Sequence, residues 1–428
     1  MDPITQSIPG FQEAGYNRPG VLSQAAEFID SRPDFQAPVD LVPMDEYETR
    51  LMLIETIVNM QKAVRHDKDW QISVLQFTVL LCMPLAALET PKDHTCLREY
   101  LDRFGMLFNH FFQKDTSVAA TSGKRPSESL SRQTASQRPA PLSVENLRKL
   151  EGEIGCDEKE RDKCCSQDRE QCIITATGDA HVCHIIPFAW NRNLENIAKT
   201  DYIMTSITSG MGLWINTVDI SAFVSLSAEL GASDKAWNML TLAPSLQTWW
   251  RSGFFGLKFM GKTPSESDPS QTEVQLQFRW MPRSRESNAT RKINIQDQRD
   301  PEKCLLADLT HYYGEGERSS CAQPCGMCDE TALRTAYNAR NHHRVASGAI
   351  FKVMRDTATV KYFQVMIEIQ WAIICAAAMS GAAQSPELLV SSDDEDHFAY
   401  WQWAENEGKY QWAREGRGAE YDSNGESI

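Results

Sequence analysis

One histidine lies where its side chain could transfer a proton. His184 is in the second of two β-prone stretches, CIIT and HVCHII, and the Gly178-Asp179 pair between them predicts a β-hairpin. Alternation along a strand turns the His184 side chain to one face, and an imidazole suits general acid–base work near neutral pH. The same pattern fits a histidine that only packs in a core, so His184 alone does not decide between the two roles.

A second segment could supply the elements that hold such a histidine. Asn238 precedes the apolar stretch MLTL, Pro244 can start a helix, and residues 254–259 are typical of a strand. The sequence therefore predicts a hairpin, a loop and a helix, in that order along the chain.

These segments resemble the HNH nuclease family, in its fungal branch. The likeness rests on CIIT, HIIPF, NMLTL and IQWAIICAAAMSGAA, and it covers about residues 160–382. It implies a ββα-metal module in which His184 is the general base for hydrolysis of DNA phosphodiester bonds. It also implies that Asn238 orients this histidine and steadies the loop, so that His184 points into a concavity near Asn238.

The resemblance implies one divalent metal ion, Mg, Mn or Zn, but two ligand positions are altered. Gln247 stands where the family has a metal-binding histidine, and Cys183 stands at a position that is often acidic. An amide oxygen can still bind a hard cation, whereas a thiolate prefers soft metals. Two changed ligands could abolish catalysis. Two functions stay open: a metal-dependent endonuclease, or a catalytically inactive scaffold of HNH fold that binds nucleic acid or other proteins.

Two further clusters could serve such a module. Three arginines near it could contact phosphates, namely Arg283, Arg285 and Arg291. Three closely spaced cysteines could share a structural zinc with a fourth ligand, although free thiols in a loop fit the same spacing. The three are Cys321, Cys325 and Cys328, and the fourth ligand would be Cys304 or His311.

Composition and charge limit the class of protein. The chain has 428 residues, of which 42% are hydrophobic and 24% charged, as in folded globular proteins. The 12 cysteines and the lack of an export signal predict an intracellular protein, nuclear or cytoplasmic. The net charge of −15 argues against a generic nucleic-acid binder, but about eight of these charges fall after Gln384. DNA therefore remains the expected partner, and the most apolar stretches are too short to predict a membrane span.

Changes of composition predict five segments. Residues 1–43 are rich in Pro and Gly and predict a flexible leader, and residues 44–113 show apolar residues at helical spacing that predict a helical subdomain. Residues 114–143 predict a disordered linker. Residues 144–383 form the HNH-like module with insertions, and residues 384–428 form an acidic, aromatic tail that could dock a protein.

The end of the module carries a strand signal and a long apolar helix signal. Residues 347–353 predict the strand, and the apolar positions from Phe363 to Ala378 predict an amphipathic helix that Gly381 ends. The predicted fold class is thus α+β: a ββα-metal module, an N-terminal helical region and a C-terminal helix packed on the module.

Overall fold

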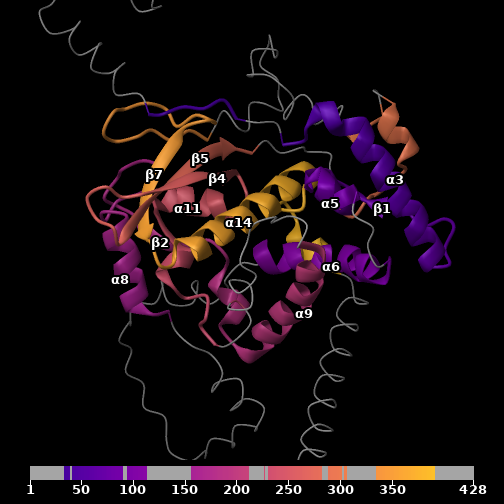
Figure 1. Cartoon of the computed structure of the whole chain (residues 1–428), viewed down its shortest axis with the longest axis horizontal. Helices are drawn as coiled ribbons and strands as arrows, with labels where there is room; N and C mark the ends of the chain where they lie inside the picture. The colour runs from indigo at the N-terminus through magenta and orange to yellow at the C-terminus, as the bar shows by residue number, and fades with distance from the viewer. Residues whose placement is uncertain are drawn as a thin grey trace, which may run out of the picture.

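The helix α14 (Val360–Ser380) runs through the middle of the computed structural model of the chain (Figure 1). Most of its 21 residues are buried, because apolar side chains occur on all its sides rather than along one stripe. Gly381 ends the helix in the left-handed conformation with φ of 77°, as predicted. Among the described residues, α14 alone has the length and apolar composition to cross a bilayer, but its burial is that of a core helix.

The structure describes residues 33–38, 41–89, 94–112, 156–211, 226, 230–281, 288–300, 303–305 and 334–390. The predicted linker at 114–143 lies outside these residues, as do most of the leader and of the acidic tail.

One face of α14 is covered by a three-stranded antiparallel sheet. The strand order is β4-β5-β7, where β4 is Phe255–Pro264, β5 is Gln271–Trp280 and β7 is Ile350–Asp356. Alternate residues of β5, such as Val274, Leu276 and Phe278, are fully buried, as the period of a strand with one core face requires. The predicted strand at 347–353 is confirmed, with its observed start at Ile350.

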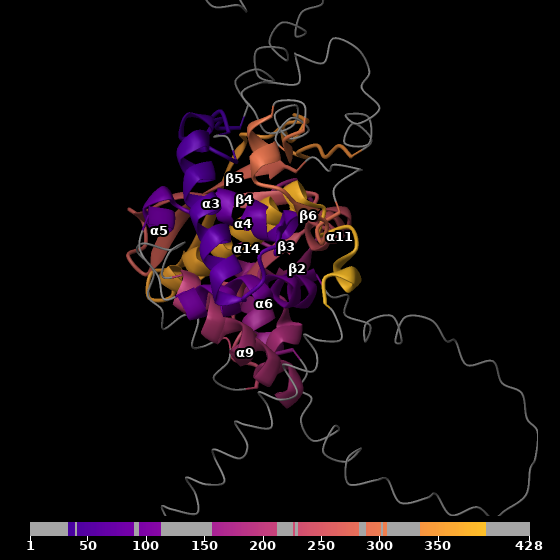
Figure 2. The same ribbon diagram turned by 90° about the vertical axis from the view of Figure 1, so that its right-hand side faces the viewer.

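Helices from the N-terminal part of the chain pack against one another, and α4 among them packs on α14. They are η1 (Met44–Glu46), α3 (Tyr47–Val64), α4 (Val74–Cys82), α5 (Leu85–Glu89) and α6 (His94–Phe112). Figure 2 shows α3, α4 and α6 in front of α14, and α4 contacts α14 directly. Ser73 and Gln76 cap the start of α4 reciprocally, so the apolar run begins at a defined residue.

This helical part, which the sequence predicted as a helical subdomain at 44–113, shares one hydrophobic core with the rest of the molecule. The physical reason is that α4 is apolar on nearly all sides and needs partners on more than one face. A two-stranded pairing of β1 (Ile72–Ser73) with β6 (Lys292–Ile293) adds a second connection. The 3-10 helix η5 (Gln296–Arg299) follows β6 and lies against α3, where Arg299 forms an ion pair with Glu55 at 2.8 Å.

Both ends of the described chain also lie on this body. Phe35 pairs with Ala349 beside the sheet, and Val42 is buried, so the end of the predicted flexible leader is packed. After α14, the short helix η7 (Pro386–Leu388) lies on α6, where Asn109 donates to the Pro386 carbonyl at 2.9 Å. The predicted boundary of the acidic tail at residue 384 thus falls before the last packed residues.

The remaining elements form the region around His184. In chain order they are α8 (Glu158–Gln167), β2 (His181–His184), η3 (Phe188–Asn191), α9 (Leu194–Met211), η4 (Ala236–Asn238), β3 (Met239–Leu242) and α11 (Pro244–Arg251). The fold is therefore α+β, with helices and small antiparallel sheets around one core.

Candidate functional site

The strand that carries His184 pairs with a segment far along the sequence. β2 is antiparallel to β3, with His184 opposite Met239 and His181 opposite Leu242. The predicted hairpin between CIIT and HVCHII is wrong. Residues 173–175 form a turn in which Ile173 donates to the Thr241 carbonyl at 3.0 Å. The fully buried β3 offers the better partner, which overrides the local β propensity of CIIT.

The elements after Asn238 follow the predicted order. β3 begins at Met239, and Pro244 occupies the first turn of α11, where its missing N–H costs no hydrogen bond. Helix α11 contacts both β2 and β4. The two antiparallel strands β2 and β3 are thus followed in sequence by the helix α11, with η3 and α9 between the two strands.

The Asn238 side chain hydrogen-bonds two backbone segments near His184. Its Oδ1 accepts from the Ile186 N–H at 2.9 Å, and its Nδ2 donates to the carbonyls of Ile186 at 2.9 Å and Ser233 at 3.0 Å. The Asn238 carbonyl also accepts from the Ile185 N–H at 2.8 Å. The side chain is fully buried with its oxygen and nitrogen both used, so it fixes the backbone that follows His184 and the backbone that precedes Asp234.

His184 itself is paired with a carboxylate. Its Nε2 lies 2.7 Å from Asp234 Oδ1, and its ring stacks on Phe188 at a centroid distance of 5.3 Å. The other Asp234 oxygen accepts from the Asp157 N–H, directly before α8. Such a carboxylate holds the proton on Nε2 and leaves the lone pair on Nδ1, the arrangement that a general base needs. The His184 side chain is 15% exposed, so the pair is not sealed in the core.

Sequence reasoning missed Asp234. The residue lies at the end of the inserted segment, four positions before Asn238, in a turn that Gly231 opens with φ of 73°. Its main-chain N–H donates to the Gly231 carbonyl at 2.9 Å. Closeness to Asn238 was the one signal that could have singled out Asp234 among the acidic residues.

Cys183 is turned away from His184 by the alternation of β2. Its thiol is buried and donates to the Leu240 carbonyl at 3.3 Å. Burial raises the pKa of this thiol well above its usual range, mainly because a thiolate would lose its hydration there. A metal needs the thiolate, so the described surroundings of Cys183 favour packing over ligation.

The divalent ion that the resemblance implies does not fit the residues that the structure describes. No three His, Cys, Asp or Glu side chains among them come together as a metal-binding group. The Asp234 carboxylate, which lies next to His184, is already hydrogen-bonded to His184 and to the Asp157 N–H. Gln247 is half-buried on α11, which contacts β2, and it offers only a neutral oxygen.

The other predicted site residues are partly outside the described chain. Arg283, Arg285, Cys321, Cys325 and Cys328 all lie there. Arg291 is exposed, and its carbonyl accepts from the Val74 N–H at 2.9 Å. Cys304 is half-buried in a short described stretch after η5.

A buried ion pair between Asp168 and Arg355 forms hydrogen bonds to the backbone of β3. Arg355 Nη1 on β7 lies 2.7 Å from Asp168 Oδ1 at the end of α8, and Arg355 Nη2 donates to the Met239 carbonyl at 3.3 Å. Asp168 Oδ2 accepts from the Thr241 N–H at 2.8 Å. The guanidinium also lies over the Phe363 ring at 4.5 Å. One pair thus connects α8, β3, β7 and α14.

No protein-family model, curated protein or solved structure matches this chain. What the chain does must therefore be inferred from the residues themselves.

Proposed function

We propose that the chain is an HNH-like hydrolase of DNA phosphodiester bonds in which His184 is the general base. The observation that carries the proposal is the hydrogen bond of 2.7 Å between His184 Nε2 and Asp234 Oδ1. A histidine that only fills a core has no need of a carboxylate that fixes its tautomer and leaves the second nitrogen with a lone pair.

The step that these residues perform is proton transfer from water. A water molecule gives its proton to His184 Nδ1 while its oxygen forms a bond to phosphorus, and the bond from phosphorus to the leaving oxygen breaks. Asp234 stabilises the imidazolium that results, as the carboxylate does in other His–Asp pairs. Asp234 is thus a positioning residue.

The likeness to HNH nucleases is supported by the order of β2, β3 and α11 and by the buried Asn238 amide. Asn238 holds both sides of the loop on which the His184–Asp234 pair depends, because its bonds reach Ile186 and Ser233. This is the role that the resemblance implies for an asparagine at that position.

A catalytically inactive scaffold of HNH fold is the alternative, and a specific observation favours it. The described residues include no metal-binding group of three, and the pKa of the Cys183 thiol is raised by burial. A scaffold would keep the fold for binding nucleic acid or protein, and its His184–Asp234 pair would serve stability alone.

A plasmid-nicking assay across Mg, Mn and Zn, with metal analysis of the purified protein, separates the two functions. His184→Ala should reduce nicking to background, and Asp234→Asn should reduce it strongly. His181→Ala is a matched control, because His181 is exposed on the same strand. Wild-type nicking that survives His184→Ala unchanged would remove His184 from the reaction.

The variant Gln247→His sharpens this test. If α11 lies in the register that the resemblance implies, the new imidazole should tighten binding of a transition metal and raise nicking above wild type. The double variant Gln247→His with His184→Ala should return to background because no base remains. Unchanged metal binding by Gln247→His would favour the scaffold.

A further inference from the structure

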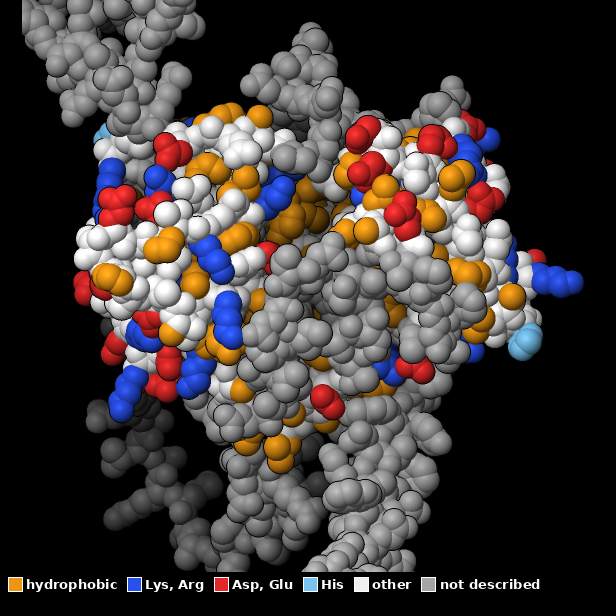
Figure 3. Space-filling view, viewed as in Figure 1, with side chains coloured by type: hydrophobic (Ala, Val, Ile, Leu, Met, Phe, Trp, Pro, Cys, Tyr) orange, Lys and Arg blue, Asp and Glu red, His pale blue; other side chains and the backbone are white. Residues whose placement is uncertain are grey.

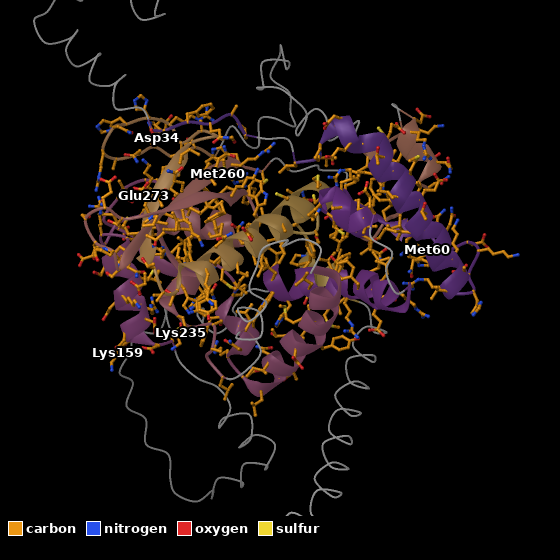
Figure 4. All side chains as sticks on the ribbon, in the orientation of Figure 1. Asp34, Met60, Lys159, Lys235, Met260 and Glu273 are labelled. Carbon is orange, nitrogen blue, oxygen red and sulfur yellow. The ribbon has the colours of Figure 1, made fainter. Side chains whose placement is uncertain are left out.

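The first turn of α8 lies against the turn that carries Asp234. Helix α8 contacts η4 and both strands of the β2–β3 pair. Figure 3 shows charged side chains of both signs over this part of the surface. Figure 4 labels Lys235, directly before η4, beside α8, and it labels Lys159 toward one end of that helix. The start of α8 is therefore close to the residues that hold His184, although it precedes them by many positions in the sequence.

Two hydrogen bonds connect the start of α8 to this turn. The Asp157 N–H donates to Asp234 Oδ2, the carboxylate oxygen that His184 does not use. Glu160 Oε2 accepts from the Ala236 N–H at 3.0 Å. The Glu160 side chain is 24% exposed, so water competes only in part for this bond. The first bond holds the carboxylate itself, and the second holds the backbone two residues after Asp234.

A small apolar cluster joins the same elements. Cys164 of α8 is buried together with Ala236 and Met239, and Val182 of β2 packs against them. Val182 and His184 share one face of β2, because alternate residues of a strand point the same way. Helix α8 thus packs on the face of the β2–β3 pair to which His184 belongs.

Asn238 also holds the turn, but at other atoms. Its Nδ2 donates to the Ser233 carbonyl at 3.0 Å, and its N–H donates to the Lys235 carbonyl at 2.7 Å. Neither bond uses the Ala236 N–H, so the bond to Glu160 holds the turn independently of Asn238. Lys235 Nζ lies 3.6 Å from Glu160 Oε1, and such a pair at a partly exposed surface contributes little. The part of Glu160 that matters is therefore its acceptor oxygen rather than its charge.

We propose that Glu160 is a positioning residue of the His184 site, which keeps the Asp234 carboxylate on His184 Nε2 by accepting from the Ala236 N–H. This inference rests on the proposed role of His184 as general base. Without Glu160 the N–H of the buried Ala236 loses its acceptor, and the turn must move to bring that N–H to water. The same movement shifts Asp234, and its bond to His184 weakens steeply with distance and angle. Helix α8, to which the resemblance assigns no role, then belongs to the site.

Nitrogen NMR of the histidine side chains in the full chain tests the proposal without DNA. In the wild type, the neutral His184 ring should carry its proton on Nε2, because Asp234 accepts from that atom. Glu160→Ala should give a mixture of the two tautomers. Glu160→Gln should keep the wild-type tautomer, because its amide oxygen can still accept from the Ala236 N–H. A structural role alone would lower the unfolding temperature of Glu160→Ala and leave the tautomer unchanged, which would overturn the proposal.

The nicking assay gives a second readout. Glu160→Ala should lower kcat by about tenfold or more, because a misplaced base transfers a proton poorly. KM should change by less than about twofold, because the bond acts on the chemical step rather than on DNA binding. Glu160→Gln should keep most of the wild-type kcat, and a loss as large as that of Glu160→Ala would overturn a role as acceptor.

Glu158→Ala is the matched control. Glu158 is exposed in the first turn of the same helix, so this variant removes the same charge and leaves the bond to Ala236 in place. It should match the wild type in tautomer and in kcat, and an equal effect of both variants would overturn the proposal. The tautomer also separates this proposal from the proposed function. Mixed tautomers in Glu160→Ala, with nicking that survives His184→Ala, would support the hold on Asp234 and overturn the proposed function instead.

Discussion

Two polar pairs lie on either side of β3, and their surroundings differ. Asp168 and Arg355 are sealed, with side chains 0% and 2% exposed, and their hydrogen bonds reach the backbone of Met239 and Thr241. His184 and Asp234 are 15% and 4% exposed, and their carboxylate reaches only the backbone before α8. A sealed pair can stabilise but cannot react, whereas a pair with solvent access can exchange a proton. We therefore expect the first pair to act in stability alone, and the chemistry that we propose belongs to the second.

The largest effect should come from breaking the sealed pair. Arg355→Met leaves the Asp168 carboxylate buried without its cation and should lower the free energy of unfolding by about 3 to 5 kcal/mol. Urea denaturation followed by circular dichroism measures this loss.

The double variant Asp168→Asn with Arg355→Met should recover part of that loss, since no unpaired charge remains and the amide oxygen can still accept from Thr241. If Arg355→Met alone lowers the free energy of unfolding by less than about 1 kcal/mol, the pair does not hold β3 in place.

The next largest effect concerns Asn238, which connects the two sides of the His184 loop. Asn238→Ala leaves the N–H and carbonyl of Ile186 without their partner and should cost about 2 to 4 kcal/mol, at about 1 to 2 kcal/mol for each orphaned buried group. Chemical denaturation again measures the change. Hydrogen exchange should show that Ile185 and Ile186 lose protection first, and equal loss over the whole chain would contradict a local fastening role.

The elements around Asn238 and His184 also show what the sequence can and cannot predict. The start of α11 at Pro244, the strand after Asn238 and the end of α14 at Gly381 were predicted, because each signal lies within a few residues of the element. The pairing of β2 with β3 was not predicted, because the partner lies beyond the inserted helix α9 and CIIT offered a nearer one. A role for Asp234 was not predicted for the same reason, since only the fold brings Asp234 close to His184.

The sequence also did not predict that the N-terminal helices share one core with α14. Helical spacing in residues 44–113 predicts the helices but not where their apolar faces go, and α4 is covered by α14 from the other end of the chain. The roles of His184, Asn238 and Gln247 rest on the resemblance and remain predictions.

A smaller effect should appear at alkaline pH. Burial raises the pKa of the Cys164 thiol to about 12, and Asp168 beside it contributes in the same direction. The thiol therefore stays protonated in the folded chain while it ionises in the unfolded chain above about pH 8.5. This contribution to stability is present below that pH and is lost as pH rises toward 12.

The variant Cys164→Ala should flatten the fall of stability between about pH 8.5 and 11, measured by denaturation at each pH. Cys156→Ala is the control, because Cys156 is exposed. An unchanged alkaline slope in Cys164→Ala would show that other buried groups govern it.

The smallest effect on stability should come from the His184–Asp234 pair, and this outcome decides the comparison. The pair is one hydrogen bond with partial solvent access, and such a bond contributes about 0.5 to 1.5 kcal/mol. His184→Asn keeps a polar side chain that can still donate to Asp234, so we expect the free energy of unfolding to change by less than about 1 kcal/mol. Nicking activity should nevertheless fall to background, because an amide cannot take a proton from water. If the variant instead loses as much stability as Arg355→Met, the His184–Asp234 pair serves stability as the Asp168–Arg355 pair does. The reason to assign chemistry to His184 would then be gone.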